Sequence, residues 1–232
     1  MNVVVTGASN GIGAEIVKEL VKNGVKKIYA ISRNRNKLDQ LREVCKSIGD
    51  TEVIVFPLDL CELDTLDVNT TINNEKIDVL INNAGYLVKG DFRKLRITDV
   101  EAMYRTNVLG PFQLIQQLIN NLKQSSIAHI VNIGSMGGVQ GSLKFSGLSA
   151  YSSSKAAIAG LSECLAEELK EDGIKVNCLA IGAVNTEMLN KAFPDFKANL
   201  SSQQMAQYIV HFALHNHVYF NGKIVQVANS TP

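Results

Sequence analysis

Tyr151 and Lys155 lie four residues apart in the stretch Tyr151-Ser152-Ser153-Ser154-Lys155. On a helix, residues at this spacing share a face, so the Lys155 ammonium can lie beside the Tyr151 phenol. A neighbouring cation favours the phenolate and lowers a phenol pKa that is otherwise about 10. The pair therefore predicts a general acid/base for use near neutral pH. The alternative is that Tyr151 and Lys155 form an ordinary exposed pair on a helix. A second sequence motif is therefore needed to support a catalytic role.

A glycine-rich turn near the start of the chain supplies that motif. It follows the apolar run Val3 to Val5 and precedes a stretch with apolar residues at helical spacing. The turn reads Thr6-Gly7-Ala8-Ser9-Asn10-Gly11-Ile12-Gly13. Strand, glycine-rich turn and helix N-terminus together bind a dinucleotide pyrophosphate, because glycines permit close backbone approach and the helix offers free N–H groups. The spacing is G-x-x-x-G-x-G rather than the standard G-x-G-x-x-G, and a plain loop is the alternative interpretation.

Short runs rich in valine, isoleucine and leucine alternate with helical stretches along the chain. The runs predict strands at about 2–6, 27–32, 52–57, 78–82, 127–134, 174–181 and 223–228. The intervening stretches predict helices at about 12–23, 35–48, 62–74, 98–124, 150–172 and 202–214. Near-continuous apolar strands between helices indicate a parallel sheet buried on both faces. In such a sheet, ligands bind at the carboxyl ends of the strands.

With these elements in place, the chain resembles the short-chain dehydrogenase/reductase family, in its smaller, non-extended branch. Besides the two motifs above, the resemblance rests on Asn82-Asn83-Ala84-Gly85, Asn107, the run Ile130 to Ser135, and Gly182 with Thr186. It covers nearly the whole chain and includes members similar to 3-oxoacyl-(acyl-carrier-protein) reductases and carbonyl reductases. It implies one α/β domain over residues 1–232 with a Rossmann-type, doubly wound parallel sheet of about seven strands.

The resemblance also assigns catalytic roles to four residues. Ser135 is expected to hydrogen-bond the substrate carbonyl oxygen, and Tyr151 to transfer the proton. Lys155 is expected to lower the Tyr151 pKa and to hold the nicotinamide ribose, while Asn107 anchors a water in a proton relay. Taken one by one, Ser135 has an alternative role as a turn residue and Asn107 as a polar surface residue.

Cofactor contacts are expected along the same edge of the sheet. The resemblance places Asp59 at the adenine amino group, with capping of the next helix as its alternative role, and Gly182 and Thr186 at the nicotinamide carboxamide. The full expected set is Gly7, Ser9, Asn10, Gly11, Ile12, Gly13, Ser32, Arg33, Asp59, Leu60, Asn83, Ala84, Gly85, Tyr151, Lys155, Gly182, Val184 and Thr186.

Arg33 predicts a preference for NADP(H) over NAD(H). Folds that bind NAD usually carry a carboxylate about 20 residues beyond the glycine-rich turn, where it accepts from the ribose 2′-hydroxyl. Here the second predicted strand ends at Ser32 and Arg33, without a carboxylate. An arginine can instead hold a 2′-phosphate in a charge-assisted, bidentate contact. The alternative is that Arg33 projects into solvent, and Asn10 stands where many NADPH-dependent relatives carry a second basic residue.

Three departures from the family pattern bear on the site. Ile181 replaces the proline that usually precedes Gly182, which is expected to loosen the nicotinamide loop. The segment between Ser135 and Tyr151 is longer than usual, and Leu143 and Phe145 are its candidates for lining a substrate pocket. The end of the chain, Val227 to Ser230, lacks the family's Asp-Gly-Gly.

Association into a homodimer or homotetramer is also expected. In the family, the helices equivalent to 98–124 and 150–172 pack against a twofold-related copy. Leucines recur every four residues on both helices, at Leu114, Leu118 and Leu122 and at Leu161, Leu165 and Leu169. These stripes favour helix packing. Burial against the sheet of the monomer is the alternative.

The composition excludes other classes of partner. With 23 Lys+Arg and 22 Asp+Glu residues, the net charge is +1, so no nucleic-acid partner is expected. No apolar run approaches the roughly 20 residues that span a bilayer. A predicted strand directly after Met1 leaves no room for a signal peptide. No membrane partner and a cytoplasmic location are therefore expected.

The cysteines and histidines do not predict a metal site. Cys45, Cys61, Cys164 and Cys178 lack metal-ligand spacing and are interpreted as reduced, buried thiols. No carboxylate or cysteine completes a site with His211, His215 and His217, which are expected to end the last helix.

The sequence leaves three functions to compare. The leading one is an NADP(H)-dependent oxidoreductase acting on a small-molecule carbonyl/alcohol pair. A cofactor-binding sensor without catalysis is the second, although such proteins usually lose the tyrosine or the lysine. A sugar-nucleotide epimerase or dehydratase is the third, although its glycine spacing differs. The segment from Glu187 to about Ser201 has no diagnostic polar cluster, so the substrate is not predicted.

Overall fold

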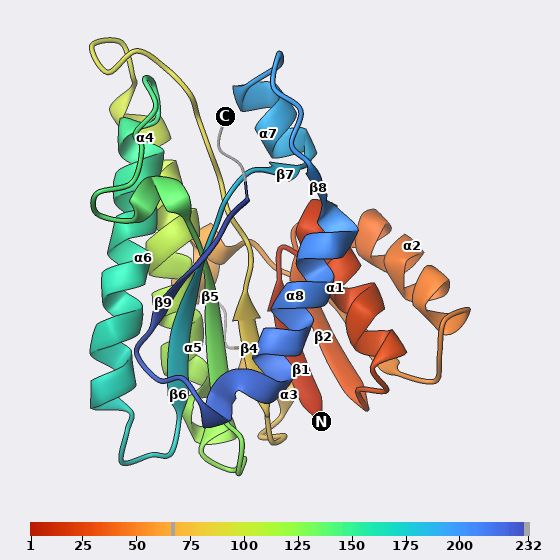
Figure 1. The fold of residues 1–232 in the computed structure, drawn as a ribbon. Helices are drawn as coiled ribbons and strands as arrows, with labels where there is room; N and C mark the ends of the chain where they lie inside the picture. Colours follow the sequence, from red (N-terminus) through yellow and green to blue (C-terminus); the bar gives the residue numbers. More distant parts are fainter. Residues whose placement is uncertain (66–67, 230–232) are drawn as a thin grey trace.

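The computed structural model describes residues 1–65 and 68–229, and its centre is a parallel sheet (Figure 1). The strand order is β3-β2-β1-β4-β5-β6-β9. Its strands are β1 (Asn2–Thr6), β2 (Lys27–Ser32), β3 (Glu52–Pro57), β4 (Val79–Asn82), β5 (His129–Ser135), β6 (Lys175–Ile181) and β9 (Ile224–Val227). All neighbouring pairs within this sheet are parallel. The doubly wound α/β fold predicted from the sequence is confirmed.

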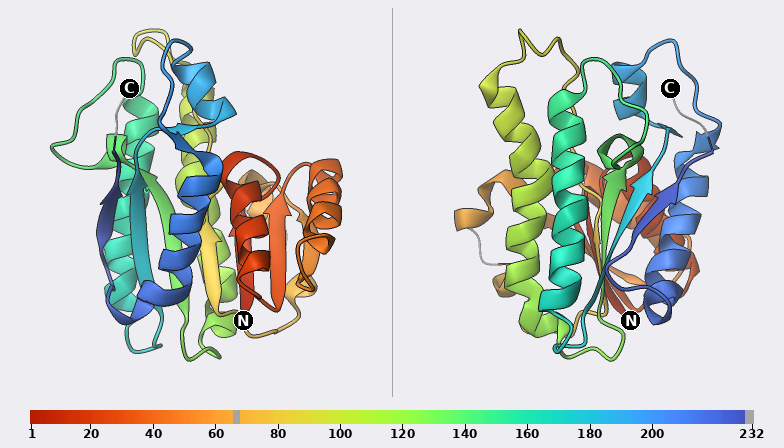
Figure 2. Two further views of the ribbon diagram at one scale, coloured as in Figure 1. Left: turned by 45° about the vertical axis from the view of Figure 1, so that its right-hand side comes forward. Right: turned by 60° about the vertical axis from the view of Figure 1, so that its left-hand side comes forward.

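Helices cover both faces of the sheet (Figure 2). One face packs against α1 (Gly11–Lys22), α2 (Arg35–Lys46) and α8 (Ser202–His215), and the other against α3 (Asn69–Ile72), α5 (Gly110–Leu122) and α6 (Ser149–Glu168). Successive strand residues point to opposite faces, so Val3 and Val5 enter the first core and Val4 the second. This alternation explains why the strands read as unbroken apolar runs.

The helix predicted over 98–124 is interrupted in the structure. It divides into α4 (Ile97–Tyr104), a π-helical turn (Arg105–Leu109) and α5. A π turn inserts one extra residue into the helical ladder and often marks a functional site. Apolar periodicity could not reveal this turn, because the helices on both sides of it keep their pattern.

The helix predicted over 62–74 is wrong for the described residues. The chain instead forms a short 3₁₀ helix (Leu60–Thr65) and the four-residue α3, while residues 66–67 of the predicted helix lie outside the described residues. The segment is rich in Asp, Asn and Thr, whose side chains compete for backbone hydrogen bonds and lower helix propensity. Three further short elements were not expected: β7 (Val184–Asn185), α7 (Glu187–Ala192) and β8 (Leu200–Ser201).

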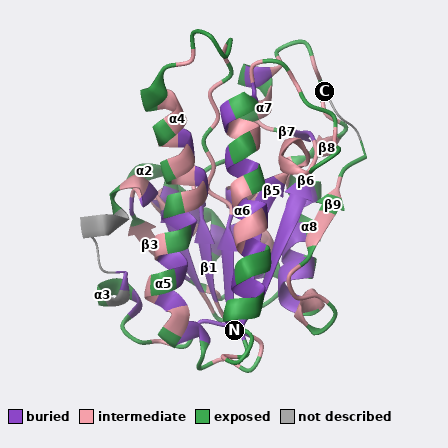
Figure 3. Cartoon of the chain, turned by 90° about the vertical axis from the view of Figure 1, so that its left-hand side faces the viewer, coloured by how far each residue is buried: buried purple, intermediate pink, exposed green. Residues whose placement is uncertain are grey.

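The leucine stripes face the interior of the monomer. Leu114, Leu118 and Leu122 are fully buried against the sheet, Leu165 and Leu169 are 9% and 7% exposed, and Leu161 is half-buried and packs against the same core. Figure 3 views the face that carries α4, α5 and α6 and shows buried residues gathered in the strands behind them. The alternative account of the stripes is therefore the correct one, and they give no support to association.

Two of the cysteines differ from the expectation. Cys45 and Cys178 are buried, but Cys61 is half-buried and Cys164 is exposed. Cys164 lies on the solvent side of α6, where the apolar periodicity is broken by Glu163 and Glu167. Within the part of the chain that the structure describes, no helix is both long and apolar enough to cross a membrane.

Leu118→Ala is expected to lower the free energy of unfolding by about 2–5 kcal/mol, because it leaves a cavity between α5 and the sheet. Leu143 is 62% exposed, and Leu143→Ala is expected to change that energy by less than about 0.5 kcal/mol. Urea unfolding followed by circular dichroism measures both. Similar losses for the two variants would contradict the packing described here.

Candidate active site

A cavity of about 610 Å³ opens at the carboxyl ends of the central strands. It lies where the strand order reverses between β1 and β4, the expected ligand position in a doubly wound sheet. Sixteen of the predicted site residues line it: Gly7, Ser9, Asn10, Gly11, Ile12, Gly13, Ser32, Arg33, Asp59, Leu60, Asn83, Ala84, Gly85, Tyr151, Lys155 and Thr186. The structure therefore brings together motifs that are distant in the sequence.

The glycine-rich turn packs directly against the segment that follows β4. Gly7 has a φ of +66°, and a Cβ atom there would lie 2.8 Å from Ala84 Cα. A Cβ atom on Gly13 would overlap the Gly7 carbonyl oxygen. The Asn83 amide donates to the Thr6 carbonyl at 3.0 Å. These contacts require glycine and keep the floor of the cavity as bare backbone, which suits close approach of a pyrophosphate.

The first turn of α1 faces this cavity. Its N-cap is Asn10, whose side chain makes no capping hydrogen bond in the structure described here and instead donates to Glu187 Oε2 at 3.1 Å. The first N–H groups of a helix have no partner within the helix, and they favour anions. The geometry thus fits a dinucleotide whose pyrophosphate lies on the α1 N-terminus.

A cationic group marks the far end of the cavity. Arg33 follows β2, its side chain is 74% exposed, and Nη1 lies 3.7 Å from Asp59 Oδ2. Asp59 Oδ1 also accepts from the Cys61 N–H at 3.0 Å, so Asp59 has the turn-capping role that was its alternative interpretation. Lys37 lines the cavity as well, although its place in a polar helix start gave no sign of this in the sequence.

Tyr151 and Lys155 lie in the first two turns of α6 and face the cavity. Lys155 is only 4% exposed, and its Nζ donates to the Ile133 carbonyl at 2.8 Å. The same Nζ lies 6.0 Å from the centroid of the Tyr151 ring. The shared helical face predicted from the spacing is therefore observed.

The expected effect of Lys155 on the Tyr151 pKa is not observed. Burial raises the pKa of Tyr151 to about 12, and a hydrogen bond with Ser135 opposes that rise. Burial lowers the pKa of Lys155 to about 8. For both groups, removal from water disfavours the charged form and is the largest cause of the shift in pKa. At neutral pH the phenol is therefore protonated, which is the form that can donate a proton to a carbonyl oxygen.

Asn107 lies inside the π turn and is 1% exposed, so its interpretation as a surface residue is wrong. Its Oδ1 accepts from Tyr86 N–H at 2.8 Å, and its Nδ2 donates to Tyr86 O at 3.0 Å and to Ser154 Oγ at 2.9 Å. A Cβ atom on Gly85 would lie 3.7 Å from Asn107 Oδ1 and 3.6 Å from Lys155 Nζ. Both polar atoms therefore border one small space.

At the expected nicotinamide end, some of the predicted residues line the cavity and others do not. Thr186 lines the cavity and caps α7 by accepting from the Leu189 N–H at 3.1 Å, and Ile181 lines the cavity beside it. Gly182 and Val184 do not line the cavity. Gly182 N–H donates to Val227 O at 2.8 Å and so extends the sheet, and Val184 is buried in the core. The strand alternation around Ile181 turns these two positions away.

Several lining residues were missed from the sequence. They belong to the loop after β4, to the segment around α7 and, for Thr106, to the π turn. They are Tyr86, Leu87, Lys89, Thr106, Glu187, Met188, Lys191 and Ala192. Following each loop a few residues beyond its recognised motif, past Gly85 and past Thr186, would have found most of them.

A second cavity of about 690 Å³ adjoins this region. The long segment before Tyr151 contributes Phe145 to it, as predicted, while Leu143 is not among its lining residues. Phe145 meets Phe193 edge to face with ring centroids 5.6 Å apart. The described residues contain no group of three potential metal ligands, and His215 lies in the last turn of α8.

Known proteins resemble this chain over most of its length. Nodulation protein G of Rhizobium sp. (strain N33) is 28% identical over 238 residues, covering 97% of this chain and 94% of that protein. An uncharacterized oxidoreductase of Staphylococcus saprophyticus is 31% identical over 191 residues, covering 80% of this chain and 79% of the relative.

Solved structures agree on the fold. ElxO with NADP bound superposes with a TM-score of 0.85 at 26% identity, over 98% of this chain and 96% of that one. A 3-oxoacyl-(acyl-carrier protein) reductase from Brucella melitensis with bound NAD superposes with a TM-score of 0.85 at 23% identity, over 99% and 90%. The family model for short chain dehydrogenases matches residues 1–197. The chain therefore belongs to the short-chain dehydrogenase family.

Proposed function

We propose that the protein is an oxidoreductase that transfers a hydride between NADP(H) and a carbonyl/alcohol substrate, with Tyr151 as the general acid/base. One observation carries the proposal: the Tyr151 phenol and the Lys155 ammonium line the same cavity as the glycine-rich turn. A proton donor and a dinucleotide cradle are thus in one place. Both residues are present, which also argues against a sensor without catalysis.

Each residue of the site has its own role in the proposed reaction. The bound nicotinamide cofactor would supply the hydride. Hydride addition builds negative charge on the carbonyl oxygen, so the site needs a hydrogen-bond donor and one proton there. Ser135, whose side-chain hydrogen bond opposes the rise in the Tyr151 pKa and whose Oγ accepts from the Gly137 N–H at 3.2 Å, would hold that oxygen, and the protonated phenol of Tyr151 would donate to it. Lys155 would hold the ribose, and Asn107 would orient a water beside Lys155.

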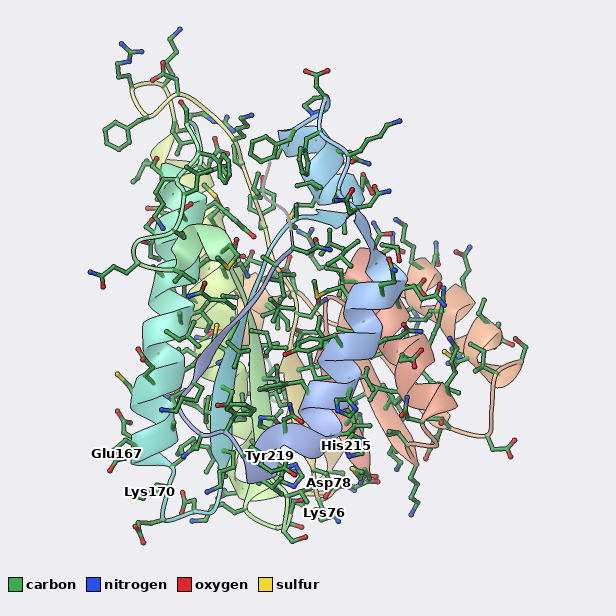
Figure 4. All side chains as sticks on the ribbon, in the orientation of Figure 1. Lys76, Asp78, Glu167, Lys170, His215 and Tyr219 are labelled. Atoms are coloured by element: carbon green, nitrogen blue, oxygen red, sulfur yellow. The ribbon has the colours of Figure 1, made fainter. Side chains whose placement is uncertain are left out.

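Tyr151→Phe is expected to lower turnover about 10²–10⁴-fold, because it removes the proton donor, while nucleotide binding persists. Oxidation of NADPH with a panel of ketones measures turnover, and fluorescence titration measures binding. Tyr219→Phe is the matched control, since Tyr219 is 78% exposed at the end of the molecule opposite the cavity (Figure 4). Near-normal turnover of Tyr151→Phe would exclude this residue as the acid.

The proposal also includes a preference for NADP(H) over NAD(H). Relatives are known with either nucleotide, so they do not decide it. Arg33 and Lys37 line the cavity together, and this second cation offsets the lack of a basic residue at Asn10. Asp59 lies 3.7 Å from Arg33, but its carboxylate is held by the local turn. Two cations at the ribose end favour a 2′-phosphate.

Arg33→Asp is expected to weaken NADPH binding about ten- to hundredfold and to leave NADH binding nearly unchanged, because a hydrogen bond to a charged group contributes about 1.5–3 kcal/mol. Dissociation constants for both nucleotides test this. Arg35→Asp serves as a control, because Arg35 is exposed, pairs with Asp39 and does not line the cavity. Equal weakening of both nucleotides by Arg33→Asp would refute the preference.

We also propose that the chain associates, through the outer face of α4 and α5 (Figure 3). Since the leucine stripes are buried, the support comes from three exposed apolar residues of the α4–α5 segment: Ile97, Leu109 and Phe112 are 68%, 49% and 40% exposed. Exposed apolar surface favours an interface where it is contiguous.

Light scattering is expected to show a dimer or tetramer of the 25.3 kDa chain at micromolar concentration. Phe112→Glu is expected to shift it toward the monomer, because a buried, unpaired charge is costly at an interface. Val218→Glu is the control, because Val218 is 65% exposed and lies outside α4 and α5. A monomeric wild type would refute the association.

A further inference from the structure

The second cavity lies between two loops at the mouth of the active site. One is the segment after β4, which rises to the upper left in Figure 1, and the other is the segment that leads into α6. Its lining includes Ser152, the neighbour of Tyr151, and it shares Lys89 with the cofactor cavity. A substrate whose oxygen lies at Tyr151 can therefore extend from the first cavity into the second past Lys89.

The charged groups around this cavity are mainly cationic. Its charged lining residues are Lys89, Asp91, Arg93 and Lys144. The Asp91 carboxylate is engaged by Arg93 at 2.8 Å. Over the described ranges, neither Lys89 nor Lys144 has a carboxylate in ion-pair contact. The cavity thus has a surplus of two positive charges.

The two lysines differ in what their ammonium groups can still do. Lys144 Nζ donates to Gly137 O at 2.8 Å, Val139 O at 2.6 Å and Ser142 Oγ at 2.9 Å, which uses all three N–H donors. Lys89 Nζ makes a single hydrogen bond of this kind, to Ala192 O at 2.7 Å. Two donors of Lys89 are therefore available to a ligand, while Lys144 contributes only its charge.

Aromatic contacts hold the Lys89 ammonium at the cavity. Its Nζ lies 4.1 Å from the centroid of the Phe193 ring, a cation–π contact. Phe193 in turn packs edge to face on Phe145, which lines the second cavity. An apolar wall therefore lies next to a fixed cation with unused donors, and a ligand with a short apolar stretch and an anionic end matches both.

We infer that Lys89 is the specificity-determining residue for an anionic group at the far end of the substrate. This inference rests on the proposed function and deepens it. The substrate class is a carbonyl compound, or its alcohol, that carries a carboxylate or a phosphate ester separated from the reacting carbon by a short apolar spacer. Lys89 binds the anion with its free N–H donors, and Lys144 adds attraction without direct contact.

The test compares keto acids with their methyl esters, which differ only in the charge. Levulinate and its homologues with one and two more methylene groups are assayed with NADPH, each beside its ester, and keto phosphates of matched length form a second arm. Wild type is expected to prefer the acid about fivefold or more in kcat/KM, and Lys89→Met to bring the acid-to-ester ratio of kcat/KM to about one. Lys89→Arg keeps the charge and is expected to keep the preference. Lys94→Met is the control, an exposed lysine of the same loop that lines neither cavity.

Binding of the same pairs is followed by ligand-detected NMR on enzyme saturated with NADP⁺, so the inference can be judged apart from turnover. Equal binding of acids and esters to wild type, or equal losses of both in Lys89→Met, would overturn the inference. Lys89 would then have a purely structural role, through its contact with α7. A charge preference that depends on Lys89 without any turnover would uphold the anion site and refute the proposed reaction. Preference for the phosphate arm alone would assign the site to phosphate esters.

Discussion

The active site is organised around a buried ammonium group. Removing a charge from water is costly unless it is hydrogen-bonded, and Lys155 is almost fully buried. The hydrogen bond from Lys155 Nζ to the Ile133 carbonyl offsets part of that cost. The lowered pKa of Lys155 reflects the part of the cost that is not offset. Asn107 and Gly85 border the same space, so a π turn, a strand end and a loop must all be correctly placed around one side chain. The fold makes this possible because parallel strands end together at one edge.

Burial also explains why the Tyr151 pKa is raised rather than lowered. A cation lowers the pKa of a phenol only when it lies close to the phenolate and when burial does not strongly disfavour the phenolate. Here Lys155 Nζ donates to the Ile133 carbonyl and lies 6.0 Å from the centroid of the Tyr151 ring, and burial disfavours the Tyr151 phenolate. The protonated phenol suits reduction of a carbonyl.

The elements that sequence patterns predicted well are those with local causes. The strands and α1, α2, α6 and α8 follow from apolar periodicity, and the glycine-rich turn follows from steric limits that only glycine meets. The π turn at Asn107 and the direction of the Lys155 ammonium depend on contacts with Tyr86, Ser154 and Ile133, which are far apart in the chain. Such contacts produce no periodic pattern in the sequence. The same holds for Gly182, whose N–H donates to Val227 O, and for Val184, which is buried in the core, so that neither lines the cavity.

The two cavities show why a reaction class is easier to predict than a substrate. The cofactor cavity is built from backbone held by glycines and from strand ends, so its sequence requirements are strict and recognisable. The second cavity is formed by side chains from loops that meet only in the folded chain, with Phe145, Phe193 and Lys89 each contributed by a different segment. Nothing in the spacing of these three residues signals their contact. Differences between members of one fold accumulate in loops of this kind, so the proposed preference for an anionic substrate rests on these loops rather than on Tyr151.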